Sequence, residues 1–131
     1  MKKEQIGILI DVNECVAKRV EIPKELGNYY NMLNCSTVQI VRMKLGGVYF
    51  DVYCDEEARL KFGQLASAAD KSGNVALVGN ILFTHTDSDG ETIGLKEEEM
   101  VNILSHVTRY SAEDDDGKLK SVPIVRGLEW Y

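Results

Sequence analysis

Residues 41–52 have the sequence VRMKLGGVYFDV, in which two glycines separate two runs of strand-forming residues. Because glycine tolerates a positive φ angle, Gly46 and Gly47 are typical of the two-residue turn of a β-hairpin. Pairing Leu45 with Val48 across this turn fixes the register of both strands. The sequence therefore predicts a β-hairpin whose strands precede and follow the two glycines.

This register separates the side chains of the hairpin into two faces. One face is apolar and holds Val41, Met43, Leu45, Val48, Phe50 and Val52. On the other face Arg42 lies opposite Asp51 and Lys44 lies opposite Tyr49, as favourable cross-strand pairs do. Val38 and Ile40 are out of phase with the apolar face, which predicts a β-bulge before Val41.

Upstream of the hairpin the apolar pattern changes from strands to a helix. Short apolar runs at residues 6–12 and 16–22 predict two strands joined by a turn at residues 13–14. Pro23 suits the first turn of a helix, and apolar residues at helical spacing predict that helix over residues 24–33.

Downstream, residues 55–69 have helical composition interrupted by Gly63 and predict a short helix or turn followed by an irregular stretch. Residues 74–86 predict a central strand, with Gly79 and Asn80 marking a bulge or a close approach of a backbone or ligand. The remaining segments are a turn at residues 87–90, a strand at 91–93, a helix over 96–107, a polar loop after Tyr110, and an edge strand or docked tail over 122–131.

These elements predict an α+β fold, in which an antiparallel sheet built from β-hairpins carries one or two helices on one face. We expect a single domain over residues 1–110, followed by an acidic loop and a C-terminal extension over 111–131 that docks on the domain or at a sheet edge. A chain of 131 residues is long enough to bury a core without disulfides or metal.

Composition and charge exclude several classes of protein. The apolar runs are too short to span a membrane, so we expect no membrane-spanning segment. Cys15, Cys35 and Cys54 are widely spaced and form no Cys-x-x-Cys pair, which suits a reducing compartment and predicts a cytoplasmic protein. The net charge of −6 argues against direct binding to nucleic acid, which requires basic side chains.

The excess of negative charge lies in the last third of the chain. Residues 1–84 hold ten acidic and ten basic residues, whereas residues 85–131 hold eleven acidic and five basic ones. Such runs are usually solvated faces, and the alternative is a surface that mimics nucleic acid and occupies a basic host protein. The candidate surface comprises Asp87, Asp89, Glu97, Glu98, Glu99, Asp114, Asp115 and Asp116.

Candidate catalytic and metal sites are weakly supported by the sequence. The glycine and glutamate near Asp87 do not match the spacing of a calcium-binding loop. Cys54 precedes three acidic residues, which disfavour a reactive thiolate, so we expect a buried structural cysteine. In an enzyme, His85 would be the base and Asp87 its orienting partner. We expect no catalytic residue, no metal and no cofactor.

A ligand site is best placed on the hairpin and the nearby glycine. Basic and aromatic side chains could hold a small nucleotide beside backbone amides, although ordinary cross-strand pairing explains the same residues. The candidate ligand-binding residues are Arg42, Lys44, Tyr49, Tyr53, Gly79 and Asn80.

Three stretches resemble a family of short uncharacterised proteins, a domain of unknown function from Gram-positive bacteria, their phages and mobile elements. They are YFDVYCDEEARLK at residues 49–61, NVALVGNILF at 74–83 and GETIGLKEEEM at 90–100. The resemblance covers residues 6–107 and offers no catalytic residue. It implies an accessory protein of a phage or mobile element that acts on host defence.

The sequence therefore predicts a non-catalytic binding or interaction protein whose ligand is a host or phage protein or a small nucleotide. The alternatives are the acidic nucleic-acid mimic and a small enzyme of unknown reaction. We also expect a homodimer, because two-fold assemblies are the commonest oligomers.

Overall fold

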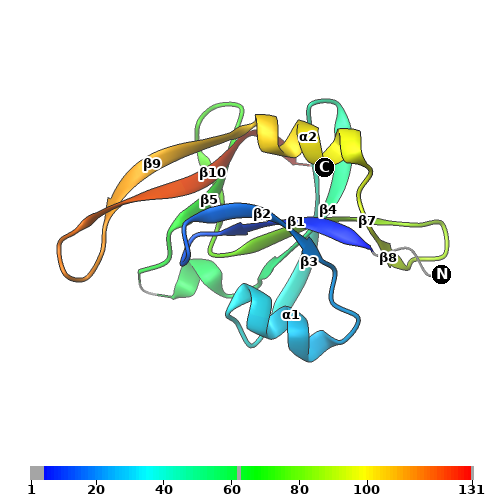
Figure 1. Ribbon diagram of the computed structural model, residues 1–131, viewed down its shortest axis with the longest axis horizontal. Helices are drawn as coiled ribbons and strands as arrows, with labels where there is room; N and C mark the ends of the chain where they lie inside the picture. Colours follow the sequence, from blue (N-terminus) through cyan, green and yellow to red (C-terminus); the bar gives the residue numbers. More distant parts are fainter. Residues whose placement is uncertain (1–4, 62, 131) are drawn as a thin grey trace.

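The structure is a computed structural model that describes residues 5–61 and 63–130. Of these residues, 51% lie in strands and 16% are helical. The elements, shown in Figure 1, are β1 (Ile6–Asp11), β2 (Val16–Glu21), α1 (Leu26–Leu33), β3 (Val38–Leu45), β4 (Val48–Asp55), the 3-10 helix η1 (Ala58–Leu60), β5 (Ala66–Asp70), β6 (Val75–Val78), β7 (Ile81–Thr86), β8 (Thr92–Ile93), α2 (Glu97–Ser105), β9 (Val107–Glu113) and β10 (Leu119–Trp130).

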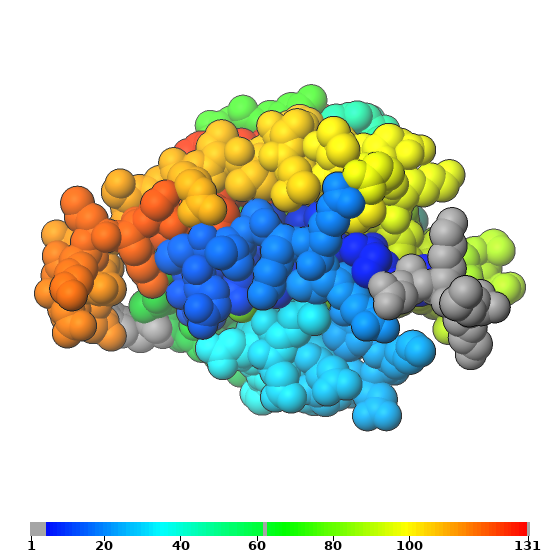
Figure 2. All heavy atoms as spheres, in the orientation of Figure 1, coloured from blue at the N-terminus to red at the C-terminus, as the bar shows by residue number. Residues whose placement is uncertain are grey.

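The strands form one mixed sheet in the order β2-β1-β7-β4-β3-β10-β5-β6, with β8 beside β7 and β9 beside β10. β5 and β10 run parallel. The predicted fold class, an antiparallel hairpin sheet with helices on one face, is therefore wrong. The protein is mostly β, and its two α-helices lie on opposite sides of β1 and β2 (Figure 2).

The sheet curls around a single large core. Only Gly79 and Asn80 separate β6 from β7, although these strands are the eighth and the third in the sheet. The two ends of the strand order must therefore approach each other, and inward side chains of β1, β3, β4, β5, β6, β7 and β10 pack together. α2 contributes Met100 and Ile103 to this core, while α1 covers a second cluster on the outer side with Tyr29 and Leu33.

The predicted hairpin of residues 41–52 is confirmed in its register. Leu45 pairs with Val48, Met43 with Phe50 and Val41 with Val52. The predicted bulge before Val41 is wrong, because the pairing continues without a shift from Leu45 to Val38. Val38 instead packs under α1, and Ile40 stays half exposed on the outer face.

Most of the other predicted elements are present. The strands at β1, β2 and β8 and the helices α1 and α2 fall where the sequence places them. The irregular stretch expected before residue 69 is instead strand β5, and the expected central strand is divided into β6 and β7 at Gly79 and Asn80.

The last strand, β10, lies inside the sheet rather than at its edge. Its first residues pair with β9, Val125 pairs with Ala68 of β5 on the other side, and Trp130 pairs with Met43 of β3. The expectation of an edge strand or tail is wrong because Val122, Val125 and Leu128 are fully buried in the core. None of the described helices has the length and apolarity needed to cross a membrane.

Candidate binding site

The predicted ligand residues of the hairpin lie together on its outer face. Arg42 Nε is 3.2 Å from Asp51 Oδ1, and Lys44 Nζ is 5.6 Å from the centre of the Tyr49 ring. These contacts are the cross-strand pairs that the register predicts. They engage the basic side chains and the aromatic ring that a nucleotide would have to contact.

Tyr53 does not join this group, because α1 covers it. Its ring stacks on Tyr29 at 4.5 Å between ring centres, and its hydroxyl lies 2.5 Å from Thr92 Oγ1. Burial raises the pKa of the Tyr29 hydroxyl well above its usual range. Tyr53 is thus part of the second cluster beneath α1, where a nucleotide would have to displace the helix.

Gly79 and Asn80 form a structural junction between β6 and β7. The Asn80 side chain is buried, accepts a hydrogen bond from the Val12 N–H at 2.9 Å and donates one to the Met32 carbonyl at 3.2 Å. Gly79 has a φ of 78°, and a Cβ there would lie 3.0 Å from Gln64 Oε1. The six predicted ligand residues are therefore divided among three environments.

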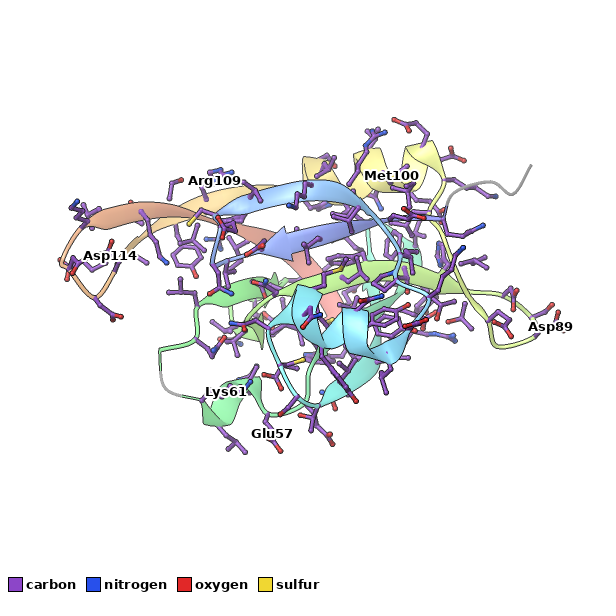
Figure 3. The ribbon with its side chains drawn as sticks, turned by 60° about the horizontal axis from the view of Figure 1, so that its bottom comes forward. Glu57, Lys61, Asp89, Met100, Arg109 and Asp114 are labelled. Carbon is purple, nitrogen blue, oxygen red and sulfur yellow. The ribbon has the colours of Figure 1, made fainter. Side chains whose placement is uncertain are left out.

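The predicted acidic surface is also divided. Figure 3 shows Asp89 and Asp114 at opposite ends of the molecule, one on the β7–β8 loop and the other on the β9–β10 loop. Figure 1 shows the same separation of the two loops. A continuous stripe of carboxylates, as a nucleic-acid mimic requires, is not formed by these two groups.

Several of these acidic residues belong to a turn that occurs three times. In each copy an aspartate Oδ1 accepts the N–H groups two and four residues later, and a glycine with positive φ stands at the fourth position. The turns begin at Asp70, Asp87 and Asp114. Such aspartate-capped turns close hairpins, so Asp87 and Asp114 have a structural role. The sequence signal for this turn is Asp-x-(Ser/Asp)-Gly, which occurs in all three loops.

The acidic start of α2 is partly paired. Arg19 of β2 makes a two-pronged ion pair with Glu97, with an Nη2–Oε1 distance of 2.6 Å. Glu99 accepts the N–H of Lys96 at 2.7 Å and so caps the helix, while its other oxygen contacts His85 Nε2. Glu98 is exposed, and no partner for its side chain is recorded in the described part of the chain.

The Arg19–Glu97 pair gives a testable pH effect. The hydrogen bond from Arg19 lowers the pKa of Glu97 in the folded state. The pair therefore stabilises the folded state fully above the pKa that Glu97 has in the unfolded chain. This stabilisation is lost as the pH falls through the lower, folded-state pKa. In the variant Arg19→Gln, an NMR titration should return the pKa of Glu97 toward its ordinary value. Lys18→Gln, which changes a neighbouring base, should leave it unchanged; an unaltered pKa in Arg19→Gln would contradict the assignment.

His85 is placed differently from the predicted base and orienter. Its ring stacks on Phe50 at 5.2 Å between ring centres and contacts Glu99, whereas Asp87 is engaged by the N–H groups of its own turn. His85 therefore links α2 to the core through its contacts with Glu99 and Phe50. Across residues 5–61 and 63–130, no three His, Cys, Asp or Glu side chains are grouped as metal ligands.

A cavity of about 130 Å³ is lined by residues of β3, β4, η1, β6 and β10, where sequence patterns indicated no site. Gln39 and Cys54, which pair across β3 and β4, and Trp130 at the end of β10 form part of its wall. The other lining residues are Asp55, Glu56, Ala58 and Arg59 around η1, and Ala76, Leu77 and Val78 of β6. The predicted burial of Cys54 is confirmed, and burial raises the pKa of its thiol to about 11, which keeps it protonated.

Charged side chains in and around η1 surround this cavity. Asp55 Oδ2 is 2.6 Å from Lys61 Nζ, and Arg59 Nη2 donates to the carbonyls of Val75 and Ala76 at 2.9 and 2.8 Å. Figure 3 shows Glu57 and Lys61 on the same outer corner.

A second hollow of about 500 Å³, beside Pro23 and Asn28 at the start of α1, is wide and open to solvent.

Among the described residues, part of the edge of β3 beside the cavity has no partner strand. β10 pairs with β3 at Lys44 and Met43, and among the described residues no strand pairs with residues 38–41 on that side. This segment has the sequence VQIV, and the Ile40 side chain is 53% exposed. An unpaired strand edge offers N–H and C=O groups to another chain.

A family model described as a domain of unknown function, DUF3846, matches residues 2–108. No curated protein matches the chain, and no solved structure matches it.

Proposed function

We propose that this chain, which belongs to the DUF3846 family, is a non-catalytic binding protein that takes an extended segment of a partner protein along the open edge of β3. The observation that carries the proposal is the unpaired side of residues 38–41, next to the cavity. Addition of a strand to a sheet edge is a common way to recognise a peptide: main-chain hydrogen bonds provide affinity and side-chain pockets provide selectivity.

The edge of β3 lacks the features that protect edges against pairing. Charged residues, proline and bulges are the usual protection, and residues 38–41 contain none of them. The outer edge strand β2 differs, because Lys18 and Arg19 stand in its centre. An unprotected edge in which three of four residues are β-branched is therefore expected to have a partner strand.

Two exposed apolar side chains lie near the unpaired edge of β3. Eight large apolar residues are exposed among the described residues; of these, Trp130 lines the cavity, and Ile40 lies at the unpaired edge on the outer face of β3. Exposed apolar side chains beside an unpaired strand edge are typical of a protein-interaction site. The role in a phage or mobile element that the sequence resemblance implies stays a prediction, as do the cytoplasmic location and the homodimer.

A random peptide library displayed on a carrier tests the proposal. The Gly46–Gly47 turn directs the N–H groups of alternate residues of β3 away from β4, so that the Ile40 N–H faces the open edge. Selected peptides should alternate β-branched residues, and the variant Ile40→Pro, which removes this N–H, should weaken their binding at least about tenfold, or roughly 1.4 kcal/mol. Ile40→Thr keeps the N–H and should bind normally.

Thermal unfolding of both variants shows whether the fold persists, since proline is tolerated where its N–H side faces solvent. Peptides that bind folded Ile40→Pro as well as the parent chain would refute docking at this edge. A dimer in light scattering that dissociates in Ile40→Pro would identify a second copy, instead of a partner protein, as the occupant.

A further inference from the structure

The size of the cavity limits what it can hold. Pockets for drug-sized ligands span about 300–1,000 Å³, whereas this cavity measures about 130 Å³. Its lining includes Gln39 of the unpaired segment of β3 and three residues of β6, so it lies beside the edge that the proposed segment would occupy. The fitting occupant is one side chain of that segment.

The lining favours a positive charge on this side chain. Asp55 and Glu56 line the cavity against one basic residue, Arg59, whose Nη2 is bound to two carbonyl oxygens. Lys61 neutralises Asp55, but Glu56 is exposed at the rim and Glu57 follows it. The three carboxylates Asp55, Glu56 and Glu57 therefore exceed the two basic residues Arg59 and Lys61 by one negative charge, and among the described residues Glu56 forms no ion pair.

The walls suit the rest of a basic side chain. Ala58, Ala76 and Leu77 are buried and apolar, so they can contact methylene groups while the charged end stays at the rim. Trp130 is 53% exposed, and the face of an indole ring is the best aromatic partner for a cation. The raised pKa keeps Cys54 neutral, so its thiol adds to the apolar wall.

We infer that the cavity between β3 and β6 receives one lysine or arginine side chain of the docked segment, with its charge between Glu56 and Trp130. This inference rests on the proposed strand addition and specifies its partner: an extended segment with a basic residue among β-branched neighbours.

Three synthetic peptides test the inference: acetyl-Thr-Val-Thr-X-Thr-Val-Thr-amide with X as lysine, norleucine or glutamate. Trp130 is the single tryptophan of the chain and lines the cavity, so its fluorescence reports binding directly. We expect the lysine peptide to bind about tenfold more tightly than the norleucine peptide, and the glutamate peptide to bind most weakly. Added salt should reduce the preference for lysine.

Variants of the rim separate charge from general structure. Glu56→Gln should reduce the preference for lysine over norleucine at least about threefold, while leaving the norleucine peptide unaffected. Glu98→Gln, which removes an exposed carboxylate on α2, should change neither.

Equal or stronger binding of the norleucine peptide would overturn the inference while leaving strand addition intact, provided that binding still depends on Ile40. Binding of the lysine peptide that is insensitive to Ile40→Pro would overturn the proposed docking edge itself. No fluorescence response to any of the three peptides would also reject the inference, because the cavity would then hold no such side chain.

Discussion

The variant Phe50→Ala is expected to lose about 3–5 kcal/mol of unfolding free energy, because a large buried ring would be replaced by a cavity. Phe50 is fully buried in the core. Its ring meets Phe83 edge to face at 5.9 Å between ring centres and stacks on His85, which contacts Glu99 of α2. The truncation therefore loosens both the centre of the sheet and the attachment of α2.

Urea unfolding followed by circular dichroism measures this loss. A domain of this size has a total stability of about 5–15 kcal/mol, so a loss of this size should move the urea midpoint to a much lower concentration. Tyr49→Ala is the matched control, since Tyr49 precedes Phe50 on the same strand and is 46% exposed; it should lose less than about 1 kcal/mol. A loss for Phe50→Ala as small as that of the control would contradict the central position of Phe50 in the core.

The orientation of Phe50 could be predicted because a hairpin is local. Its turn type, its register and its two faces follow from twelve consecutive residues, and each confirms the others. The same local reasoning located α1 and α2, whose apolar residues recur at helical spacing.

Contacts between distant segments could not be predicted in this way. β5 pairs in parallel with β10 although more than fifty residues separate them, and no local signal specifies such a partner. Tyr53 looked like an exposed neighbour of Tyr49 because both share a strand face, but α1 covers one and leaves the other accessible.

The candidate binding site also depends on contacts between distant segments. Its cavity gathers Gln39, Cys54, Arg59, Ala76 and Trp130, which come from five separate elements or their margins. The sequence did contain one usable hint, because VQIV at residues 38–41 is an apolar strand segment without charge or proline. Whether its edge is open depends on where β10 runs, and this is set by the whole fold.

The variant Asn80→Ala should destabilise the fold rather than remove a ligand contact. Asn80 joins the end of β1 to α1, because its side chain accepts the N–H of Val12, the residue after β1, and donates to the Met32 carbonyl. Without it the Val12 N–H is left buried and unpaired, which costs about 1–3 kcal/mol, and the lost packing adds to this figure. Asn74→Ala, at an exposed turn position, is the control and should change the unfolding free energy by less than about 0.5 kcal/mol.

Asn80→Asp distinguishes the two hydrogen bonds. The new carboxylate can still accept from Val12, but when ionised it presents a second oxygen to the Met32 carbonyl and repels it. When protonated, this oxygen can donate as the amide does. Burial and the facing carbonyl should raise the pKa of the new carboxyl group in the folded state, so the deficit relative to the parent chain should shrink as pH falls through that raised pKa. A deficit that is constant with pH, or a parent-like stability of Asn80→Ala, would show that the side chain does not hold this junction together.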